Sequence, residues 1–172
     1  CITYGTGVGG AIVINGAVYT GSAFSAGEFG GILIHPEARI IGNPFSGCYE
    51  KYASTTALVE AAKKLDPTLD SGRKIFSKFD EITVRELIDS WIDEIVYGLI
   101  TVIHIFNPSC IVLGGGIMAQ PYVTEQVRKR IRSEIMDSFS NVKICQAQLG
   151  NQAGMLGAAS LAWKFLDSEK MA

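Results

Sequence analysis

Three glycines near the start of the chain, Gly5, Gly7 and Gly10, form the pattern G-x-G-x-x-G, which is typical of dinucleotide-binding sites. That pattern works only with a strand before the glycines and a helix after them, so that the pyrophosphate meets a helix N-terminus. Here an extended, apolar segment follows instead, residues 11–20, with the hairpin signal Asn-Gly at its centre. The sequence context therefore excludes the dinucleotide interpretation.

The same glycines join a predicted strand over residues 1–4 to a second, antiparallel strand, and this turn contains one hydroxyl, Thr6. Glycine permits backbone angles that aim successive N–H groups inward, so such a turn can surround an anion. A structural tight turn explains the glycines equally well. The segment alone leaves both interpretations open.

A second glycine-rich bend, Gly114 to Gly116, follows the short apolar run Cys110 to Leu113, which predicts a buried parallel strand. Ligands of α/β proteins bind outside the carboxyl ends of such strands. This position favours a ligand site, and a plain strand-to-helix turn is the alternative.

Two carboxylates, Glu28 and Glu50, stand in a Gly-, Ser- and Pro-rich stretch between residues 21 and 54. A carboxylate accepts hydrogen bonds from two adjacent hydroxyls, and charged acceptors make the stronger bonds. An isolated acid is nevertheless more often a surface or helix-capping residue. Their neighbours, "GEFG" and "GCYE", are what single them out.

Composition describes one globular domain of 172 residues, 48% of them hydrophobic, with 15 basic and 17 acidic side chains and a net charge of −2. This balance argues against nucleic acid or an anionic membrane as the main partner. The basic stretch over residues 128–132 is interpreted as a solvated helix face. Dispersed cysteines, no signal peptide and no apolar run long enough to span a bilayer predict a reducing, cytoplasmic setting. The cysteines are Cys1, Cys48, Cys110 and Cys145.

Hydrophobic periodicity predicts an α/β fold, a mixed five-stranded sheet with helices on both faces. The signal Thr83-x-x-Glu86 predicts a capping box at the start of a long, buried helix that stops at Asn107-Pro108. Small residues in the last helix predict a close backbone contact there. The other predicted helices cover residues 48–65, 71–78, 122–136 and 152–166, and further strands cover 32–34 and 142–147.

Several motifs together resemble the ROK family of sugar kinases and sugar-responsive repressors, whose fold is actin-like and related to ribonuclease H. They are "GTGVGGAIVINGAVYTG", "SAGEFG", "GCYEKYAS", "NPSCIVLGGGI" and "AGMLGAASLA", in the order and at about the spacing of that family's C-terminal domain. The resemblance covers nearly the whole chain. It implies that Gly5, Thr6 and Gly7 hold ATP phosphates, and that Gly114, Gly115 and Gly116 line the adenosine side of a cleft.

The resemblance further implies that Glu28 and Glu50 grip the hydroxyls of a sugar. The implied activity is ATP- and Mg²⁺-dependent phosphorylation of a hexose or N-acyl-amino-hexose hydroxyl. In the family the catalytic aspartate and a D-x-G-G-T phosphate loop belong to the N-terminal domain, and residues 1–172 contain neither motif. We therefore expect this chain to be one domain, the C-terminal half of a two-domain kinase, with something removed upstream of Cys1 and with no turnover of its own.

Two departures from the family pattern concern metal and sugar. Gly31 stands where many members have a histidine that touches both sugar and zinc, and Cys48 alone represents a cysteine-rich zinc loop. Zinc requires four nitrogen or sulfur ligands, so we predict no structural zinc and no other bound metal site. His35 is interpreted as a loop residue, and His104 as a neutral helix histidine with a hydrogen-bond partner.

Two alternative functions remain. A sugar-sensing repressor of the same family would have DNA-binding helices outside this chain, and an upstream helix-turn-helix in place of D-x-G-G-T would identify it. A nucleotide-binding structural domain of the actin-like fold would bind magnesium-ATP and no hexose. The resemblance is also consistent with a homodimer.

Overall fold

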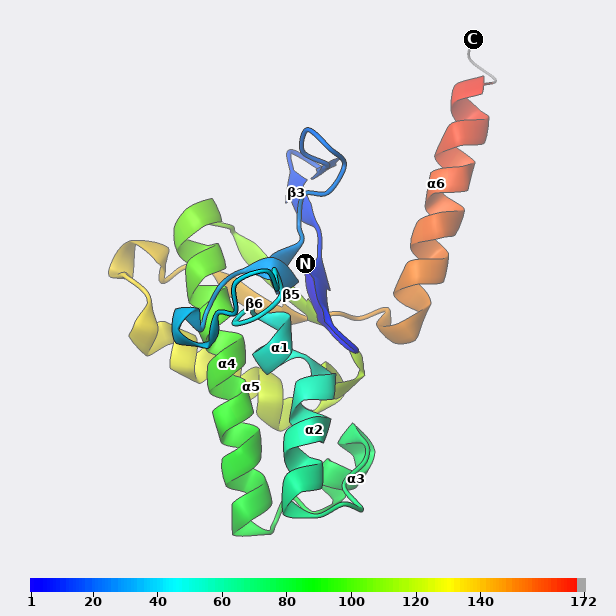
Figure 1. Cartoon of the computed structure of the whole chain (residues 1–172). Helices are drawn as coiled ribbons and strands as arrows, with labels where there is room; N and C mark the ends of the chain where they lie inside the picture. Colours follow the sequence, from blue (N-terminus) through cyan, green and yellow to red (C-terminus); the bar gives the residue numbers. More distant parts are fainter. Residues whose placement is uncertain (170–172) are drawn as a thin grey trace.

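Four strands form the main sheet, in the spatial order β2-β1-β5-β6. In this computed structural model, which describes residues 1–169, they are β1 (Ile2–Tyr4), β2 (Val8–Gly10), β5 (Cys110–Gly114) and β6 (Lys143–Gln146) (Figure 1). Strand β1 pairs antiparallel with β2 and parallel with β5, and β5 is parallel to β6. The sheet is mixed, as the sequence predicted.

The predicted fifth strand is not part of this sheet. Strands β3 (Ile12–Ile14) and β4 (Ala17–Tyr19) form a separate hairpin, and positive φ angles at Asn15 and Gly16, +52° and +77°, confirm the predicted tight turn. Segment 8–14 changes partner at Ala11, whose N–H donates to the Cys1 carbonyl (2.9 Å). From Ile12 onward this segment pairs with β4 instead of β1.

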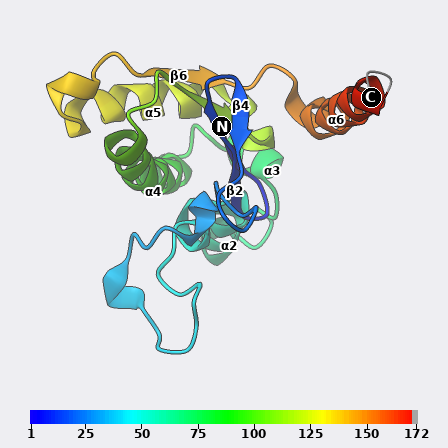
Figure 2. The same ribbon diagram turned by 90° about the horizontal axis from the view of Figure 1, so that it is seen from above.

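Helices pack against one face of the main sheet. Thr3 and Cys110 on the opposite face are exposed, and helices α4 (Ile82–Phe106) and α5 (Pro121–Glu134) cover the buried face (Figure 2). Within residues 1–169, the prediction of helices on both faces is therefore wrong. The side chains that point to the covered face are buried: Ile2, Tyr4, Ile111 and Leu113.

Helix α4 is the centre of the core, because apolar side chains recur at helical spacing along nearly its whole length. It ends at the predicted position, where Asn107 adopts a left-handed conformation (φ +42°) before a proline. The predicted capping box is wrong. Glu81 is the N-cap residue and its side chain makes no capping hydrogen bond, so Thr83 already lies inside the first turn.

The predicted helix over residues 48–65 is divided into α1 (Glu50–Ala53) and α2 (Thr55–Leu65) by one extended residue, Ser54. The Ser54 hydroxyl accepts the Ala57 N–H (3.1 Å) and so caps α2. From the core, the Trp91 indole N–H lies 3.1 Å from the carbonyl oxygens of both Ala53 and Ser54. These bonds satisfy the carbonyl groups that the break leaves without helical partners.

The remaining elements follow the predictions to within a few residues, except at two places. Segment 32–34 makes only an isolated bridge, Leu33 with Cys48, instead of a strand. Helix α6 (Ala153–Glu169) stands apart from the sheet in both views, and no atom lies within 4 Å of a methyl group added at Gly154 or Gly157, so the predicted close contact is wrong (Figures 1 and 2). The other helices are α3 (Gly72–Ser77), η1 (Phe29–Gly31), η2 (Pro36–Ala38), η3 (Gly116–Ala119), η4 (Asp137–Phe139) and η5 (Gly150–Gln152).

Candidate functional site

The turn between β1 and β2, residues 5–7, is closed by its own backbone. The Gly5 N–H donates to the Gly7 carbonyl at 2.9 Å, so this amide is engaged within the turn. Neither Gly5 nor Gly7 has a positive φ, so these two glycines do not use the left-handed angles that glycine permits. The donors that the turn can offer a ligand are the Gly7 N–H and the N–H and hydroxyl of the exposed Thr6.

Gly7 instead leaves room for a side chain, the carboxylate of Glu50. A methyl group added at Gly7 would overlap Oε2 of Glu50, and one added at Gly30 would lie 3.3 Å from the same oxygen. The Glu50 carboxylate therefore occupies space that these two glycines leave open. The structure places one of the two predicted acids directly against the first glycine bend.

Glu28, the other predicted acid, is exposed and precedes η1, and its carbonyl accepts the Gly31 N–H (3.1 Å). Only one residue separates it from Gly30, which packs against Glu50. The two acids therefore lie on adjoining segments. No atom comes within 4 Å of a methyl group added at Gly31, so the position where the family pattern has a histidine is open.

The start of α2 is bonded to the other end of the same turn. The Thr55 N–H donates to the Gly5 carbonyl (2.9 Å), and the Thr55 hydroxyl donates to the Tyr4 carbonyl (3.1 Å). The break at Ser54 makes these bonds available, because the N–H groups of a first helical turn have no partner inside the helix. Sequence reasoning missed Thr55, although the Ser-Thr-Thr run is a helix-start signal.

The second bend, Gly114–Gly116, has three glycines with different surroundings. A methyl group added at Gly114 would lie 2.9 Å from Cγ2 of Thr3, and Gly115 has a φ of +108° and packs against the Tyr4 backbone. At Gly116 an added methyl group would meet no atom within 4 Å. Two of the glycines therefore allow the bend to pack on β1, and only Gly116 faces open space.

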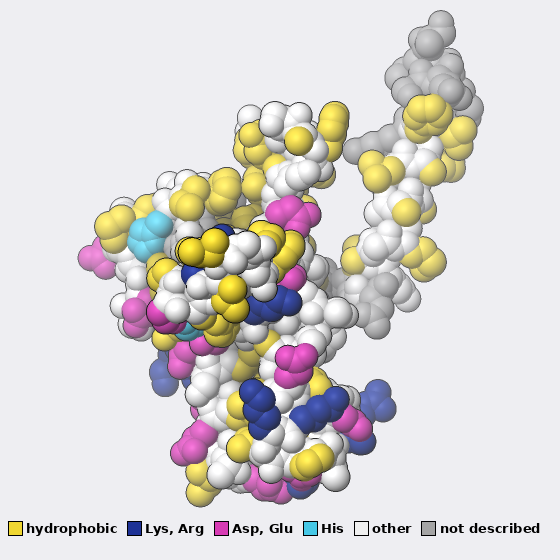
Figure 3. All heavy atoms as spheres, in the orientation of Figure 1, with side chains coloured by type: hydrophobic (Ala, Val, Ile, Leu, Met, Phe, Trp, Pro, Cys, Tyr) yellow, Lys and Arg dark blue, Asp and Glu magenta, His cyan; other side chains and the backbone are white. Residues whose placement is uncertain are grey.

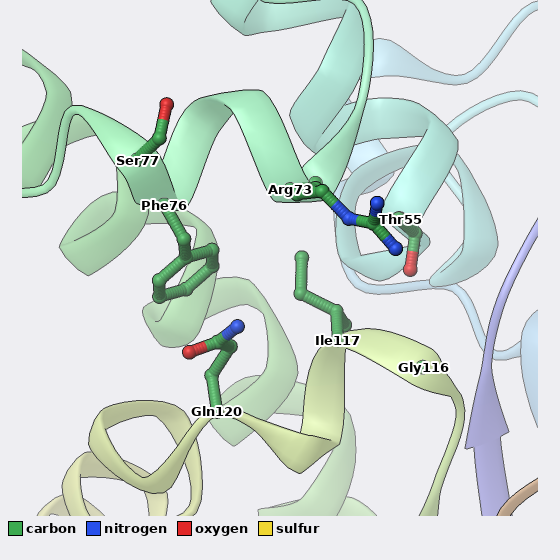
Figure 4. Close-up of a pocket in the computed structure, with 8 residues that line it drawn as sticks. Thr55, Arg73, Phe76, Ser77, Gly116, Ile117 and Gln120 are labelled. Atoms are coloured by element: carbon green, nitrogen blue, oxygen red, sulfur yellow. The ribbon is translucent and has the colours of Figure 1, made fainter.

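Gly116 opens onto a cavity of about 640 Å³ between η3, α2 and α3 (Figure 4). Phe76 and Gln120 point into it from opposite walls, and the Arg73 guanidinium lies beside Thr55. An adjoining cavity of about 450 Å³ extends to Thr6. Its lining shares Thr55, Gly116 and Ile117 with the first cavity and adds Thr56, Glu60, Lys63 and Asp70, among others. Sequence reasoning found only the glycines and Thr6, because the other lining residues come together through tertiary folding.

Cations gather around these cavities. Lys63 and Arg73 belong to the linings, and Figure 3 shows Lys and Arg side chains over α2 and α3. Asp70, an acid in the lining, is bonded to Lys74 (2.7 Å), which lowers the pKa of the Asp70 carboxyl and offsets its negative charge. Lys63 and Arg73 attract anions to this region, and the remaining acid of the lining, Glu60, opposes that attraction.

Two buried tyrosines connect the end of β1 with the start of α1. The hydroxyl oxygens of Tyr4 and Tyr49 are 2.7 Å apart, and the Tyr49 hydroxyl donates to the Ile95 carbonyl (2.7 Å). Burial raises the pKa of both phenols, so both are neutral at physiological pH. The pair ties the end of β1 and the start of α1 to the core helix.

The basic stretch of α5 makes structural bonds. Arg130 pairs with Asp89 and Asp93 of α4, and Arg128 donates to the Ile144 carbonyl (2.8 Å). Arg128, Lys129 and Arg132 are exposed, as the interpretation of a solvated face expects, whereas Arg130 is partly buried in its pairs with α4. His104, as expected, has a hydrogen-bond partner, since its Nδ1 lies 2.8 Å from the Ile100 carbonyl oxygen.

Among residues 1–169, no helix is both long and apolar enough to span a bilayer.

A mixed sheet whose strands β1 and β5 each end in a glycine bend, with helices packed behind, defines an α/β domain of the actin-like ATPase fold. The sequence model of the ROK family matches residues 1–164, and the chain therefore belongs to the ROK family.

Three similar proteins show the range of this family. A beta-glucoside kinase of Listeria innocua is 34% identical over 98% of the chain and 56% of its own length. A ROK glucokinase of Streptomyces griseus, solved with glucose and AMPPNP, has a TM-score of 0.81 at 29% identity, over 94% of this chain and 59% of its own. A ROK transcriptional regulator homologous to the MLC protein of E. coli has a TM-score of 0.75 at 26% identity. The match covers 92% of this chain and 43% of the regulator. The chain thus spans little more than half the length of the kinases that it resembles.

Proposed function

We propose that the chain is the nucleotide- and sugar-binding half of an ATP-dependent kinase that phosphorylates a hydroxyl of a hexose or an N-acyl-amino-hexose. One observation carries this proposal: the Glu50 carboxylate lies against Gly7, and the cavity at Gly116 extends to Thr6 of the same glycine turn. A sugar held by Glu50 and a nucleotide held at Gly116 would meet at Thr6 and Gly7. The kinases to which the chain is similar support this arrangement.

In this proposal, the phosphates bind to the N–H groups of Thr6 and Gly7 and to the Thr6 hydroxyl. Gly5 shapes the turn, because its own N–H is engaged there. The adenosine lies on the bare backbone of Gly116, where a side chain would take its space. Phe76 offers an apolar surface for a base, and Arg73 offers a cation.

The sugar is held by Glu50 and Glu28, each accepting hydrogen bonds from hydroxyl groups. Because Glu50 touches Gly7, the acceptor hydroxyl would be held close to the terminal phosphate. Such positioning supplies much of the catalysis of phosphoryl transfer, in which the protein does little covalent chemistry. We propose that the base which takes the proton from the sugar lies outside these 172 residues.

Magnesium would neutralise the charge of the bound phosphates, as it does in kinases generally. Mg²⁺ keeps several waters and uses few protein ligands, so the oxygens of Thr6 and Thr55 and the acids Glu60 and Asp70 suffice as a polar surrounding. The residues present thus fit a magnesium-nucleotide complex.

Calorimetric titration of a magnesium complex of a nonhydrolysable ATP analogue into the chain tests the nucleotide site. We expect saturable binding that Thr6→Val weakens by about tenfold, the effect of losing one hydrogen bond to a charged group. A matched control, Thr68→Val, removes a hydroxyl that bonds only to Asp66, outside the cavities, and should leave binding unchanged. No binding, or equal loss in both variants, would refute the nucleotide site.

Titration of hexoses into the protein with its flanking sequence separates the alternatives. A heat of binding with at least one hexose supports the sugar site if the Glu50→Gln variant no longer shows that heat. Nucleotide binding without heat from any hexose would favour a structural nucleotide-binding domain. The similarity to a ROK transcriptional regulator makes a repressor the second candidate function. Sugar binding without phosphorylation, together with a helix-turn-helix upstream, would support a repressor.

A further inference from the structure

Residues 33–48 form a loop whose two ends are bonded together. Leu33 and Cys48 make an isolated bridge, and the N–H groups of Ile34 and His35 both donate to the Gly47 carbonyl, at 3.1 and 3.0 Å. We call residues 33–35 and 47–48 the neck. Only Tyr49, which is bonded to the core helix, separates the neck from Glu50, so the neck helps to position this carboxylate.

Beyond the neck, the loop has little packing to hold it. Ile41 is fully exposed, and Ile40 and Phe45 are more than half exposed. In Figure 2 the loop extends away from the rest of the molecule. The attachment of this segment to the domain must therefore come from the neck itself.

His35 links the neck to the core helix. Its Nε2 lies 2.8 Å from Oε2 of Glu94 on α4, and its Nδ1 lies 2.6 Å from Oε1 of Glu37 on η2. Its ring packs on Tyr52 of α1, with centroids 4.0 Å apart. Three elements thus surround one imidazole, which is 23% exposed.

This arrangement requires a charged ring. An ionised carboxylate only accepts hydrogen bonds, and a neutral imidazole has one donor, so both contacts exist together only when His35 carries two protons. Loss of one proton would leave one carboxylate facing an unprotonated nitrogen. At least one link, to α4 or to η2, must then break.

We propose that His35 is a positioning residue, a proton-dependent clamp that holds the neck against α4 and so fixes Glu50 beside the glycine turn. The part of the proposal that concerns sugar rests on the proposed function. The clamp itself rests only on the contacts of His35.

The pH dependence follows from the groups around the ring, which are Glu37, Glu94 and Tyr52. Burial opposes the charge on His35, but the hydrogen bonds that the ring donates to Glu94 and Glu37 outweigh it and raise the His35 pKa above its ordinary value of 6.5. Burial also raises the pKa of the Tyr52 phenol, which therefore stays neutral near pH 7. Because the folded-state pKa is raised, the clamp is complete below about pH 6.5 and is lost as pH rises through the raised value.

Proton NMR titration of the chain tests the clamp without any substrate. We expect His35 to titrate above pH 6.5, with the amide resonances of Ile34 and His35 shifting at the same midpoint. Glu94→Gln should lower that midpoint and leave the titration of His104, the other histidine of the chain, unchanged. A His35 midpoint at or below 6.5, or one that ignores Glu94→Gln while the neck amides stay constant, would overturn the proposal.

Steady-state kinetics of the kinase, in the protein with its flanking sequence, tests the consequence for sugar. We expect His35→Asn to raise the sugar KM by about tenfold, with the KM for ATP and kcat little changed. The wild-type sugar KM should rise with pH across the His35 titration, and the variant should lose this dependence. Glu94→Gln should behave similarly, which guards against misfolding of one variant.

The two experiments test the clamp and the proposed function independently. If the NMR titration shows the clamp but no sugar binds, the proposed function fails and the clamp stands. If sugar is phosphorylated with the same KM and pH profile in both variants, the role of the clamp in sugar binding is refuted while the kinase stands.

Discussion

The two glycine bends, residues 5–7 and 114–116, look alike in sequence and differ in what their glycines do. In the first bend, Gly7 makes room for a side chain, the Glu50 carboxylate. In the second, Gly115 makes room for backbone, the Tyr4 peptide, at a φ of +108°. In each bend a methyl group added to one glycine, Gly5 or Gly116, would meet none of the described atoms within 4 Å. Identical residues in equivalent-looking bends thus serve packing, site geometry or open space, and substitution by alanine should separate these roles.

Gly115→Ala should have the largest effect. The new side chain would sit at a positive φ, which costs about 1–3 kcal/mol, and would overlap the Tyr4 carbonyl, which cannot move without moving β1. We expect the free energy of unfolding to fall by about 3 kcal/mol, or Tm by about 10 °C, in thermal unfolding. Unchanged Tm would show that the second bend is not held against β1 as described.

Gly7→Ala should harm function more than stability. Its methyl group meets the end of a flexible carboxylate, which can turn aside, so we expect unfolding to change by less than about 1 kcal/mol. The displaced Glu50 should raise the sugar KM by about tenfold or more, because bonds to a charged acceptor are lost. Glu50→Gln is the matched control, and the double variant should be little worse than either single one. Additive losses would contradict the contact.

Gly116→Ala should affect nucleotide binding alone. The added methyl group meets no protein atom but enters the cavity proposed for adenosine. We expect stability within about 0.5 kcal/mol of wild type and a several-fold weaker calorimetric affinity for the ATP analogue, growing with Gly116→Val. Unaltered affinity in both variants would place the nucleotide elsewhere.

Gly5→Ala should have the smallest effect. Its φ is not positive and its added methyl group meets no atom, so alanine should fit the turn. Reduced freedom of the unfolded chain should stabilise the protein by about 0.5 kcal/mol in urea unfolding. Nucleotide affinity should change by less than about threefold, because the Gly5 N–H already bonds to Gly7. A loss as large as that of Gly116→Ala would mean that Gly5 contacts the ligand directly.

The sequence was sufficient to predict the elements that depend on interactions between neighbouring residues. The Asn15-Gly16 hairpin, the long helix that ends at Asn107 and the strand before Gly114 all lie where they were predicted. The break at Ser54 was missed, since it depends on the indole of Trp91, some 37 residues away. The fold class was predicted correctly, whereas the change of strand partner at Ala11 was not predicted.

The candidate site was predictable only in part. Glycine bends and lone acids leave a signal in the sequence, and the structure brings Glu50, though not visibly Glu28, against the first bend. Nothing local connects Arg73, Phe76 or Gln120 with Gly116, because they meet only after α3 and η3 have packed. The roles of the bends in binding remain predictions, to be tested by the variants above.

The one-residue break at Ser54 affects a distance that matters for the proposed reaction. Ser54 alone separates the helix that begins with Glu50 from the helix whose first residue is bonded to the glycine turn. Inserting one extended residue there would shift one helix relative to the other by about 3.3 Å. A misplacement of about 1 Å can slow a reaction a hundredfold, so in the proposed kinase the length of this one-residue break would help to set the distance between acceptor and donor.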